Sequence, residues 1–368
     1  MKFSVQRDEL LSALQHIQSV VEKKNTVQIL SNIFCSVKDQ ALSLSATDLE
    51  VGMKITIPVV DADEGKLTLS AKHFLDIVKE LPSTQLHIRT KDNDWIELLC
   101  GKSKFNIVSL SAEEYPALPE FEEKTYYEAN VKALSSMIHQ TAFAVSTDAT
   151  RYHLNGVYFE KIENNLMRMT ATDGHRLSFV DQEVFLNLPE FKRGMIIPKK
   201  GLSELKKLLD EENETIGLSF DRGYFFAKTA QTFLFVRLIE GEYPDYKQVI
   251  PKNATKKAQI PREGFQSALR RVSLLAHEKS KGIKLQFQPN LLVISSSNPD
   301  MGDAIEELEI QYDGDPVDIG FNAKYLLDCL SVIETEQLDF HFNDRLSPGI
   351  LQGSDSKNHN YIIMPMRI

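Results

Sequence analysis

The chain has 368 residues, and at roughly 150 residues per domain this length predicts two or three domains. It carries 42 Lys and Arg against 52 Asp and Glu, a formal net charge of -10, which taken as an average argues against a nucleic-acid partner. With 42% hydrophobic and 26% charged residues, the composition excludes disordered, collagen-like and coiled-coil chains. No apolar run reaches the ~18 residues of a membrane span, and an early acid in MKFSVQRDELL argues against a signal peptide. We therefore expect a cytoplasmic protein with no membrane partner.

The cysteine pattern gives no support for a metal or disulfide framework. Cys35, Cys100 and Cys329 are far apart, odd in number and lack a CxxC motif or a nearby His pair. We expect each to be a small buried apolar residue, and we expect no metal and no cofactor.

Along the chain, four kinds of segment recur three times each, in the same order. First comes a short strand leading into an amphipathic helix, at residues 3–21, 127–145 and 258–276. A predicted β-hairpin follows, at residues 42–59, 167–184 and 292–310. Next is a strand followed by a second helix, at residues 67–81, 195–209 and 317–333. A closing strand ends each set, at residues 105–119, 233–251 and 361–368.

The repeat length indicates whole domains. The tripeptide Ala-Thr-Asp begins at Ala46 and again at Ala171, an offset of 125 residues, which is too long for a solenoid unit and matches a domain. Boundaries in the Pro-bearing connectors give domains at residues 1–125, 126–253 and 254–368. We predict an α+β fold of three tandem repeats, each with two helices packed on antiparallel sheet and about eight strands.

The predicted helices have one apolar face each. Spacings of three, four and seven residues place the apolar side chains on a single stripe that packs on the sheet, with the opposite face in solvent. The stripe residues are Leu10, Leu11, Leu14, Ile17 and Val21; Phe74, Ile77 and Val78; and Leu202, Leu205, Leu208 and Leu209.

Charge is distributed unevenly between these elements. Many cations lie on or beside the predicted helices, whereas hairpins and connectors carry much of the acid. Ordinary exposed helix faces would look the same. If all helices lie on one face of the protein, that face would instead attract the phosphates of a nucleic acid without recognising its base sequence.

A second asymmetry distinguishes the first repeat from the third. Lys102 and Lys104 alternate with Phe105 and Ile107 on one predicted strand, whereas the third repeat has an acidic run from Asp300 to Glu309. Such a pair of segments would suit head-to-tail self-association. Two ordinary edge strands protected by charge are an equal alternative.

Several motifs together resemble one family. They are RYHLNGVYFE at 151–160, TATDGHRLS at 170–178, GEYPDYKQVIP at 241–251, GFNAKYLLDCL at 320–330 and the terminal YIIMPMRI. In order and over the full chain, they closely resemble the bacterial DNA polymerase III β subunit, the sliding clamp family. The resemblance implies a head-to-tail homodimeric ring of six similar domains, each chain forming half, with helices lining a hole through which DNA passes. It further implies a non-catalytic processivity factor of bacterial DNA replication.

The same resemblance implies the partners. They are double-stranded and primed DNA of any sequence, a second copy of the chain, the DNA polymerase III catalytic subunit, a clamp loader, and other polymerases and repair proteins that carry a clamp-binding peptide. A P-loop motif is absent from the sequence, so we expect a separate loader to open the ring.

Site residues follow from the resemblance position by position. The family's partner-peptide pocket corresponds to Arg151, Leu154, Thr172, Gly174, His175, Arg176, Leu177, Pro244, Val249, Asn322, Tyr325, Leu346, Ile362, Met364, Pro365 and Met366. Its DNA contacts correspond to Lys24, Lys72, Asp148, Tyr152 and His153. Its dimer interface corresponds to Lys102, Lys104, Phe105 and Ile107 against Leu274, Leu275, Asp300, Asp303, Glu306 and Glu307.

Two other functions compete with this interpretation. Asp173 and His175 could form the general base of a hydrolase, but they fall in a predicted hairpin turn, and no nucleophile motif such as GxSxG accompanies them. A monomeric three-domain DNA-binding scaffold is the other alternative, and native mass separates it from a ring.

Overall fold

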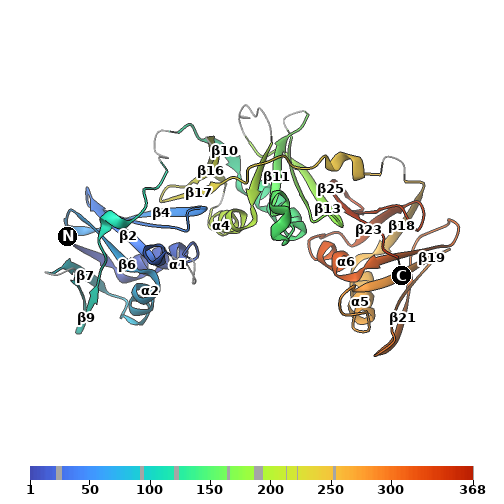
Figure 1. The fold of residues 1–368 in the computed structure, drawn as a ribbon, viewed down its shortest axis with the longest axis horizontal. Helices are drawn as coiled ribbons and strands as arrows, with labels where there is room; N and C mark the ends of the chain where they lie inside the picture. The colour runs from blue at the N-terminus through green and yellow to red at the C-terminus, as the bar shows by residue number, and fades with distance from the viewer. Residues whose placement is uncertain are drawn as a thin grey trace. The chain divides into compact units, whose positions relative to one another are not determined.

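The computed structural model describes residues 1–21, 27–91, 95–119, 124–163, 166–185, 194–212, 214–221, 223–251 and 254–367. Its internal contacts group the chain into two units. Unit 1 comprises Met1–Val131, Phe185–Pro189 and Lys200–Leu238, and unit 2 comprises Lys132–Val184, Glu190–Lys199 and Ile239–Ile368. Each unit is built on two antiparallel sheets covered by helices (Figure 1).

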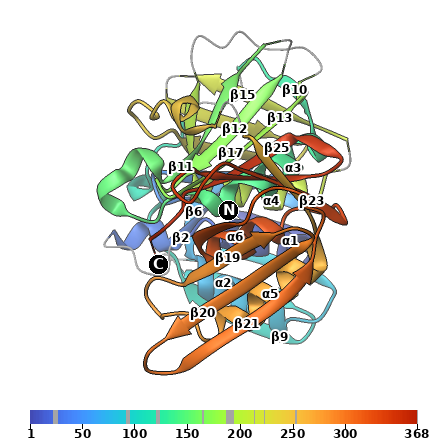
Figure 2. The ribbon, with the colours of Figure 1, turned by 90° about the vertical axis from the view of Figure 1, so that its right-hand side faces the viewer.

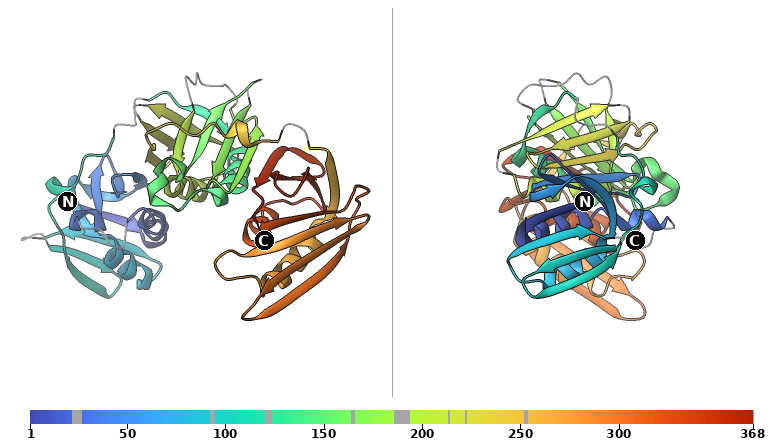
Figure 3. Two further views of the ribbon diagram at one scale, coloured as in Figure 1. Left: turned by 45° about the vertical axis from the view of Figure 1, so that its right-hand side comes forward. Right: turned by 90° about the vertical axis from the view of Figure 1, so that its left-hand side faces the viewer.

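Unit 1 contains an eight-stranded sheet and a five-stranded sheet. The eight-stranded sheet has the order β10 (Tyr127–Asn130), β15 (Thr215–Asp221), β16 (Tyr224–Lys228), β17 (Thr232–Arg237), β4 (Val51–Pro58), β3 (Ala41–Thr47), β2 (Asn32–Lys38) and β6 (Gly65–Ser70). The five-stranded sheet has the order β5 (Val60–Asp63), β1 (Lys2–Gln6), β7 (Gln85–Thr90), β8 (Trp95–Cys100) and β9 (Ser103–Val108). The right-hand panel of Figure 3 shows the cyan and teal strands of the smaller sheet in front of its helices.

Three helices belong to unit 1, namely α1 (Arg7–Gln18), α2 (Ala71–Glu80) and, from Lys200 onward, α4 (Lys199–Leu209). Helix α1 buries Leu10, Ala13, Leu14 and Ile17, so the predicted apolar face is confirmed with two corrections. Val21 is buried but follows the end of the helix at Gln18. Leu11 is half-buried at the edge of that face, because a residue adjacent to Leu10 is rotated about 100° away from it.

The second helix of each of the first two repeats follows the same rule with small departures. Helix α2 buries Phe74 and Val78, while Ile77 is half-buried. Helix α4 buries all four predicted leucines and also Glu204, which lies beside that apolar face. Glu204 is held by Ser19 and by Lys207, whose Nζ lies 2.8 Å from its carboxylate, so the burial of its charge is compensated.

Unit 2 likewise contains a large and a small sheet. The eight-stranded sheet has the order β14 (Met195–Pro198), β11 (Gly156–Lys161), β12 (Met167–Thr172), β13 (Arg176–Gln182), β25 (Ser356–Ile363), β24 (Gly349–Gly353), β23 (Gln337–Phe342) and β18 (Lys256–Pro261). The four-stranded sheet has the order β21 (Gly302–Glu309), β20 (Leu291–Asn298), β19 (Gly282–Gln288) and β22 (Val317–Asn322). Figure 2 shows β19, β20 and β21 side by side over α5.

The helices of unit 2 are α3 (Val131–Thr141), α5 (Arg262–Ser273) and α6 (Ala323–Leu330). Helices α5 and α6 bury an apolar face, including Phe265, Leu269 and Leu326, in one core with aromatic residues of the strands, such as Phe287 and Phe340. Five short 3-10 segments complete the described elements: η1 (Gln28–Ser31), η2 (Ala112–Glu114), η3 (Ala142–Ala144), η4 (Ala149–Leu154) and η5 (Tyr246–Val249).

The predicted repeat is confirmed at the level of elements. Each repeat contributes a strand and helix, a hairpin, a second strand and helix, and a closing strand, in the predicted order. One feature was not predicted: β4 pairs with β17, and β13 pairs with β25. Strands of the central repeat are therefore shared between the two large sheets, which explains why contacts assign the two halves of that repeat to different units.

The cysteines match their expected role. Cys35, Cys100 and Cys329 are all buried and unpaired. Burial raises the pKa of the Cys35 thiol to about 12. In the described ranges, no helix is both long and apolar enough to cross a membrane.

Candidate functional site

The turn between β12 and β13 is the centre of the candidate site, and all its contacts lie within unit 2. The Asp173 carboxylate accepts the backbone N–H groups of His175 (2.9 Å) and Arg176 (3.1 Å), which closes the turn. Gly174 has a φ of +88°, a backbone conformation that residues with a Cβ atom rarely adopt. The hydroxyl of Thr172 donates to the Arg176 carbonyl at 2.5 Å.

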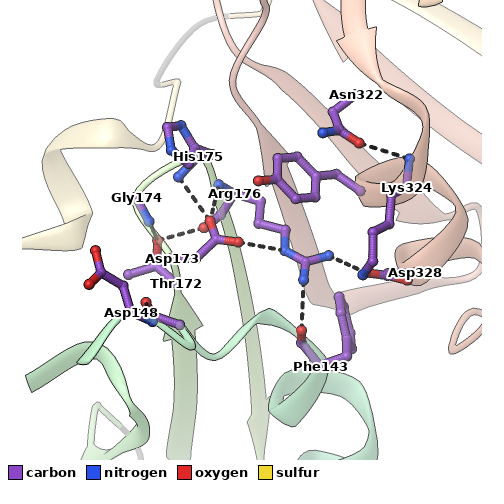
Figure 4. A network of polar contacts seen from close by, with 12 residues as sticks. Phe143, Asp148, Thr172, Asp173, Gly174, His175, Arg176, Asn322, Lys324 and Asp328 are labelled. Carbon is purple, nitrogen blue, oxygen red and sulfur yellow. Dashed lines mark hydrogen bonds and ion pairs between the residues drawn. The ribbon is translucent and has the colours of Figure 1, made fainter. Parts of the chain in front are cut away.

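Arg176 ties this turn to helix α6, as Figure 4 shows. Its side chain is 6% exposed and donates to Asp173 (3.0 Å), Asp328 (2.6 Å) and the Phe143 carbonyl (2.8 Å). Although burial by itself lowers the pKa of Arg176, contacts with Tyr361, Asp328 and Asp173 raise it above its ordinary value. The guanidinium therefore stays charged and fixes the turn against α6.

Aromatic and backbone contacts complete this arrangement. The rings of His175 and Tyr325 stack with centroids 6.4 Å apart, and the Arg176 guanidinium lies 4.6 Å from the Tyr325 centroid. The backbone N–H of Met364 donates to the His175 carbonyl (2.9 Å), and that of Met366 donates to the Gly320 carbonyl (2.9 Å). The C-terminal segment thus runs directly beside the turn.

An apolar cluster lies below the same strands. Leu177 on β13 is opposite Ile362 on β25, and both are buried with Phe179, Tyr246 and Ile350. Tyr158, Tyr243 and Ile250 pack against this cluster from its rim. A small apolar floor beside a charged, hydrogen-bonded turn is a surface suited to a short amphipathic ligand.

The remaining pocket residues lie at varying distances from this centre. The Arg151 guanidinium lies against the turn. A Cβ atom added to Gly174 would be only 2.7 Å from it. Asn322 caps α6 by accepting the N–H of Lys324 at 2.9 Å. Pro244 and Val249 are exposed around the buried Tyr246, and Leu154 is buried. Pro365 is half-buried in the C-terminal segment, whereas Leu346 is 67% exposed in the loop between β23 and β24.

This geometry does not support the hydrolase alternative. Both oxygens of Asp173 are engaged, one by the backbone of the turn and the other by Arg176. The His175 ring stacks on Tyr325. Asp173 therefore orients the turn and the guanidinium and does not orient the imidazole as a catalytic dyad requires.

Sequence reasoning missed the residues that hold Arg176. Asp328, Phe143 and Tyr361 contact it from three other elements. Asp328 gives a weak signal, because it is four residues from Lys324 on α6 and pairs with it at 2.8 Å. Nothing local in the sequence indicates that it also pairs with a residue 152 positions away.

The predicted DNA contacts are spread over three segments. Lys24 lies outside the described residues, and Lys72 is exposed in the first turn of α2. Asp148 caps η4, and hydrogen bonds from Thr150 and Arg151 lower the pKa of its carboxyl. Tyr152 is 58% exposed, and its ring meets His153 edge-on with centroids 5.7 Å apart.

The predicted interface residues include two edge strands, β9 in unit 1 and β21 in unit 2. On β9, Lys104 and Phe105 are exposed and Ile107 is half-buried, and Lys102 is exposed in the preceding turn. On β21, Asp303 and Glu307 are exposed, and Glu306 pairs with Arg271 at 2.6 Å. Asp300 and Leu274 are exposed, and Leu275 is half-buried.

Two features on or beside these strands were not predicted from the sequence. Ile305 on β21 is 66% exposed between acidic neighbours. Glu97 on β8 is fully covered by Lys104, Lys91 and Arg89, with both lysines 2.6 Å from its carboxylate. Hydrogen bonds from Lys104 and Lys91 lower the pKa of Glu97 to about 2 despite its burial. The alternation of lysine and apolar residues on β9 drew attention to Phe105. No pattern in the sequence drew attention to Ile305 on β21.

Family models match nearly the whole chain. The N-terminal, central and C-terminal domain models of the DNA polymerase III beta subunit match residues 1–119, 128–245 and 247–367.

Individual relatives agree over their full length. The beta sliding clamp of Pseudomonas aeruginosa is 35% identical, with all of both chains covered. A crystal structure of a Pseudomonas aeruginosa sliding clamp bound to griselimycin has a TM-score of 0.94 at 34% identity, covering all of both chains. The sliding clamp of Bacillus subtilis has a TM-score of 0.94 at 31% identity, covering 100% of this chain and 99% of the other.

Proposed function

Because the chain belongs to the DNA polymerase III beta subunit family, the beta sliding clamps, we propose that it works as a head-to-tail homodimeric ring around DNA. It is a non-catalytic processivity factor of bacterial DNA replication. The full-length similarity, with every domain model matched in order, is the observation that carries this function. We propose domain limits at 1–125, 126–253 and 254–368, and action in the cytoplasm.

The ring would close through strands β9 and β21 of different copies. Each is the edge of its sheet, and the two carry opposite charge. Pairing them would remove two open edges. Phe105 and Leu274 would supply apolar contact, while Lys102 and Lys104 against the acidic strand would set orientation.

The turn around Arg176 would be the partner-peptide pocket. Its charged rim, its apolar floor at Leu177 and Ile362 and the exposed Met364 suit a short peptide with an apolar anchor. Partners of this pocket would be the DNA polymerase III catalytic subunit, the clamp loader, other polymerases and repair proteins.

DNA would be held by topology and not by tight contacts. The contact residues would be Lys24, Lys72, Asp148, Tyr152 and His153, with double-stranded or primed DNA of any sequence as ligand. A lining with weak phosphate attraction lets a ring slide, because closure alone prevents escape.

Retention on DNA tests this function. The protein, loaded by a clamp loader on nicked circular DNA, should stay bound during gel filtration and should be lost after the DNA is linearised. Native mass should correspond to two chains. Equal retention on circular and linear DNA, or a stable monomer, would contradict the ring.

A further inference from the structure

The face of the eight-stranded sheet of unit 1 that points away from its buried core carries a hollow that the clamp function does not use. It is a half-open cavity of about 830 Å³ over strands β6, β2, β3 and β4 in unit 1. It is lined by Phe34, Ser36, Lys38, Ser43, Ser45, Lys54 and Lys66, and by Ala112, Glu113, Tyr115, Pro116, Ala117, Leu118 and Pro119.

Strand alternation builds the floor of this cavity. On β2, Ile33, Cys35 and Val37 are buried in the core, so Phe34, Ser36 and Lys38 point to the opposite face. The same alternation on the neighbouring strands brings serines, threonines and lysines to that face. Small hydroxyl residues in the middle of a sheet leave a trough that larger side chains would fill.

The register places two lysines on opposite sides of this trough. Lys66 is opposite Ser36, which is opposite Ser43, whereas Ser45 is opposite Lys54. With strands about 4.8 Å apart, three strand spacings and a two-residue offset separate the Cα atoms of Lys66 and Lys54 by about 15 Å. Lys38 lies two residues beyond Ser36 on the same strand.

One wall of the cavity is apolar and fixed. The rings of Phe34 and Tyr115 lie 5.5 Å apart, and burial raises the pKa of the Tyr115 hydroxyl. Thr68 and Leu110 exchange backbone hydrogen bonds of 3.2 and 3.3 Å just before this segment. The wall then continues through Pro116, Ala117 and Leu118.

We propose that this cavity binds an extended acidic peptide segment of a partner protein, one that carries carboxylates four or six residues apart, on one face of the extended chain, and an apolar side chain between them. Three lysines outweigh Glu113 among the lining residues. In the described part of the chain, Lys38 and Lys66 form no ion pair. An extended peptide rises about 3.3 Å per residue, so acids at that spacing reach both sides of the trough.

An acidic peptide fits this surface better than a nucleic acid does. The Tyr115 ring is half-buried and packs against Phe34, with centroids 5.5 Å apart, which leaves less of its face for base stacking. Glu113 lies on the wall and would repel a continuous phosphate backbone, whereas a peptide can place an apolar or neutral residue beside it.

The test uses the full chain and a labelled peptide. The probe is fluorescein-Glu-Thr-Leu-Thr-Glu-Thr-Glu, measured by fluorescence anisotropy at low salt, with the Gln-for-Glu peptide and a heptathymidylate as comparisons. We expect the acidic probe to bind the wild type and the double variant Lys38→Glu, Lys66→Glu to bind at least tenfold more weakly. The control with the same charge change is Lys2→Glu, Lys161→Glu, which alters exposed lysines outside the cavity and should bind like the wild type.

Three outcomes would overturn the proposal. They are the absence of binding by the wild type up to about 0.5 mM protein, equal binding by both double variants, and a preference for heptathymidylate that the Lys38→Glu, Lys66→Glu variant loses. The proposal is independent of the ring, because retention on circular DNA and native mass should be unchanged in that variant.

Discussion

At the scale of single residues, the site depends on a buried arginine. Arg176 donates to a carboxylate of its own turn, to a carboxylate on α6 and to a carbonyl in η3, and it supports the Tyr325 ring. Its guanidinium is nearly inaccessible to solvent, so in the proposed pocket it would position the turn, and direct contact with the peptide would fall to neighbours such as His175 and Met364, which are exposed.

Removing Arg176 should therefore affect stability and binding together. Arg176→Ala leaves Asp173 and Asp328 without their buried partner, and breaking a buried ion pair costs about 3–5 kcal/mol. We expect a loss of this order in the free energy of urea unfolding, and loss of binding of a clamp-binding peptide.

Lys324→Ala is the matched control for this variant. It removes another partner of Asp328, but one that is 63% exposed, so its effect should stay below about 1 kcal/mol. Full peptide binding by a folded Arg176→Ala protein would show that Arg176 does not position the turn.

A buried histidine should make stability depend on pH. His359 is 5% exposed, and burial lowers the pKa of its imidazole to about 4, from 6.5. The Ser178 hydroxyl donates to the Gln140 carbonyl at 2.6 Å and lies 3.0 Å from Nε2 of His359. Between pH 6.5 and 4 the unfolded chain binds a proton that the folded chain does not, so stability falls as pH decreases, by roughly 1.4 kcal/mol per pKa unit.

Urea unfolding of wild type and His359→Gln at pH 7 and pH 5 measures this effect. The variant should lose less stability over that interval than the wild type does. His73→Gln, a change at an exposed helix position, should retain the full wild-type pH dependence. Parallel curves for wild type and His359→Gln would contradict the assignment.

At the scale of elements, much of the structure could be predicted from the sequence. Strand and helix order followed from local periodicity, and the turn at Asp173 followed from residues with local turn preferences. The pairing of β4 with β17 could not be predicted, because each strand has a regular apolar alternation that fits several neighbours equally well. The turn and the terminal strand of the site could be recognised in the sequence. The contact between Arg176 and Asp328 could not, because it joins residues far apart in the chain.

Edge strand β21 offers a direct test of the proposed interface. Ile305 is 66% exposed on this strand, and we expect it to be covered in the dimer. Ile305→Lys would place a cation among acids that should pair with Lys102 and Lys104, and would remove buried apolar area. We expect at least tenfold weaker dimerisation, or about 1.4 kcal/mol, by analytical ultracentrifugation.

Val60→Lys is the control for this change. Val60 is 52% exposed on β5, at the other edge of the sheet that contains β9. The Val60→Lys substitution should leave the affinity of the dimer unchanged. Equal weakening by the two variants would argue against β21 as the interface strand.

At the scale of the whole molecule, the net charge of -10 gains a meaning that the average hides. Cations concentrate on particular surfaces, such as the group of Lys104, Lys91 and Arg89 around Glu97 and the lysine-lined cavity, while acid dominates others such as β21. An acidic average with local basic surfaces limits side-on binding to DNA and leaves encirclement as the route to stable association.

Salt should then separate topological retention from charge attraction. A protein held by phosphate contacts loses affinity steeply as salt rises, by a factor of about 10³ or more for six contacts between 50 and 200 mM. We expect the loaded protein to stay on nicked circular DNA over this range, with a less than twofold change in the retained fraction. A steep loss on intact circles would mean that contacts, and not closure, hold it.

The buried cysteines have a practical consequence for single-molecule work. A thiol must ionise and meet its reagent to react with maleimide, and all three native thiols are enclosed in the core, with the pKa of Cys35 and Cys329 raised by burial. One cysteine introduced at an exposed position such as Lys161 should therefore take up a fluorophore selectively in the unmodified wild-type background. Ring opening could then be followed optically without first replacing any residue of the core.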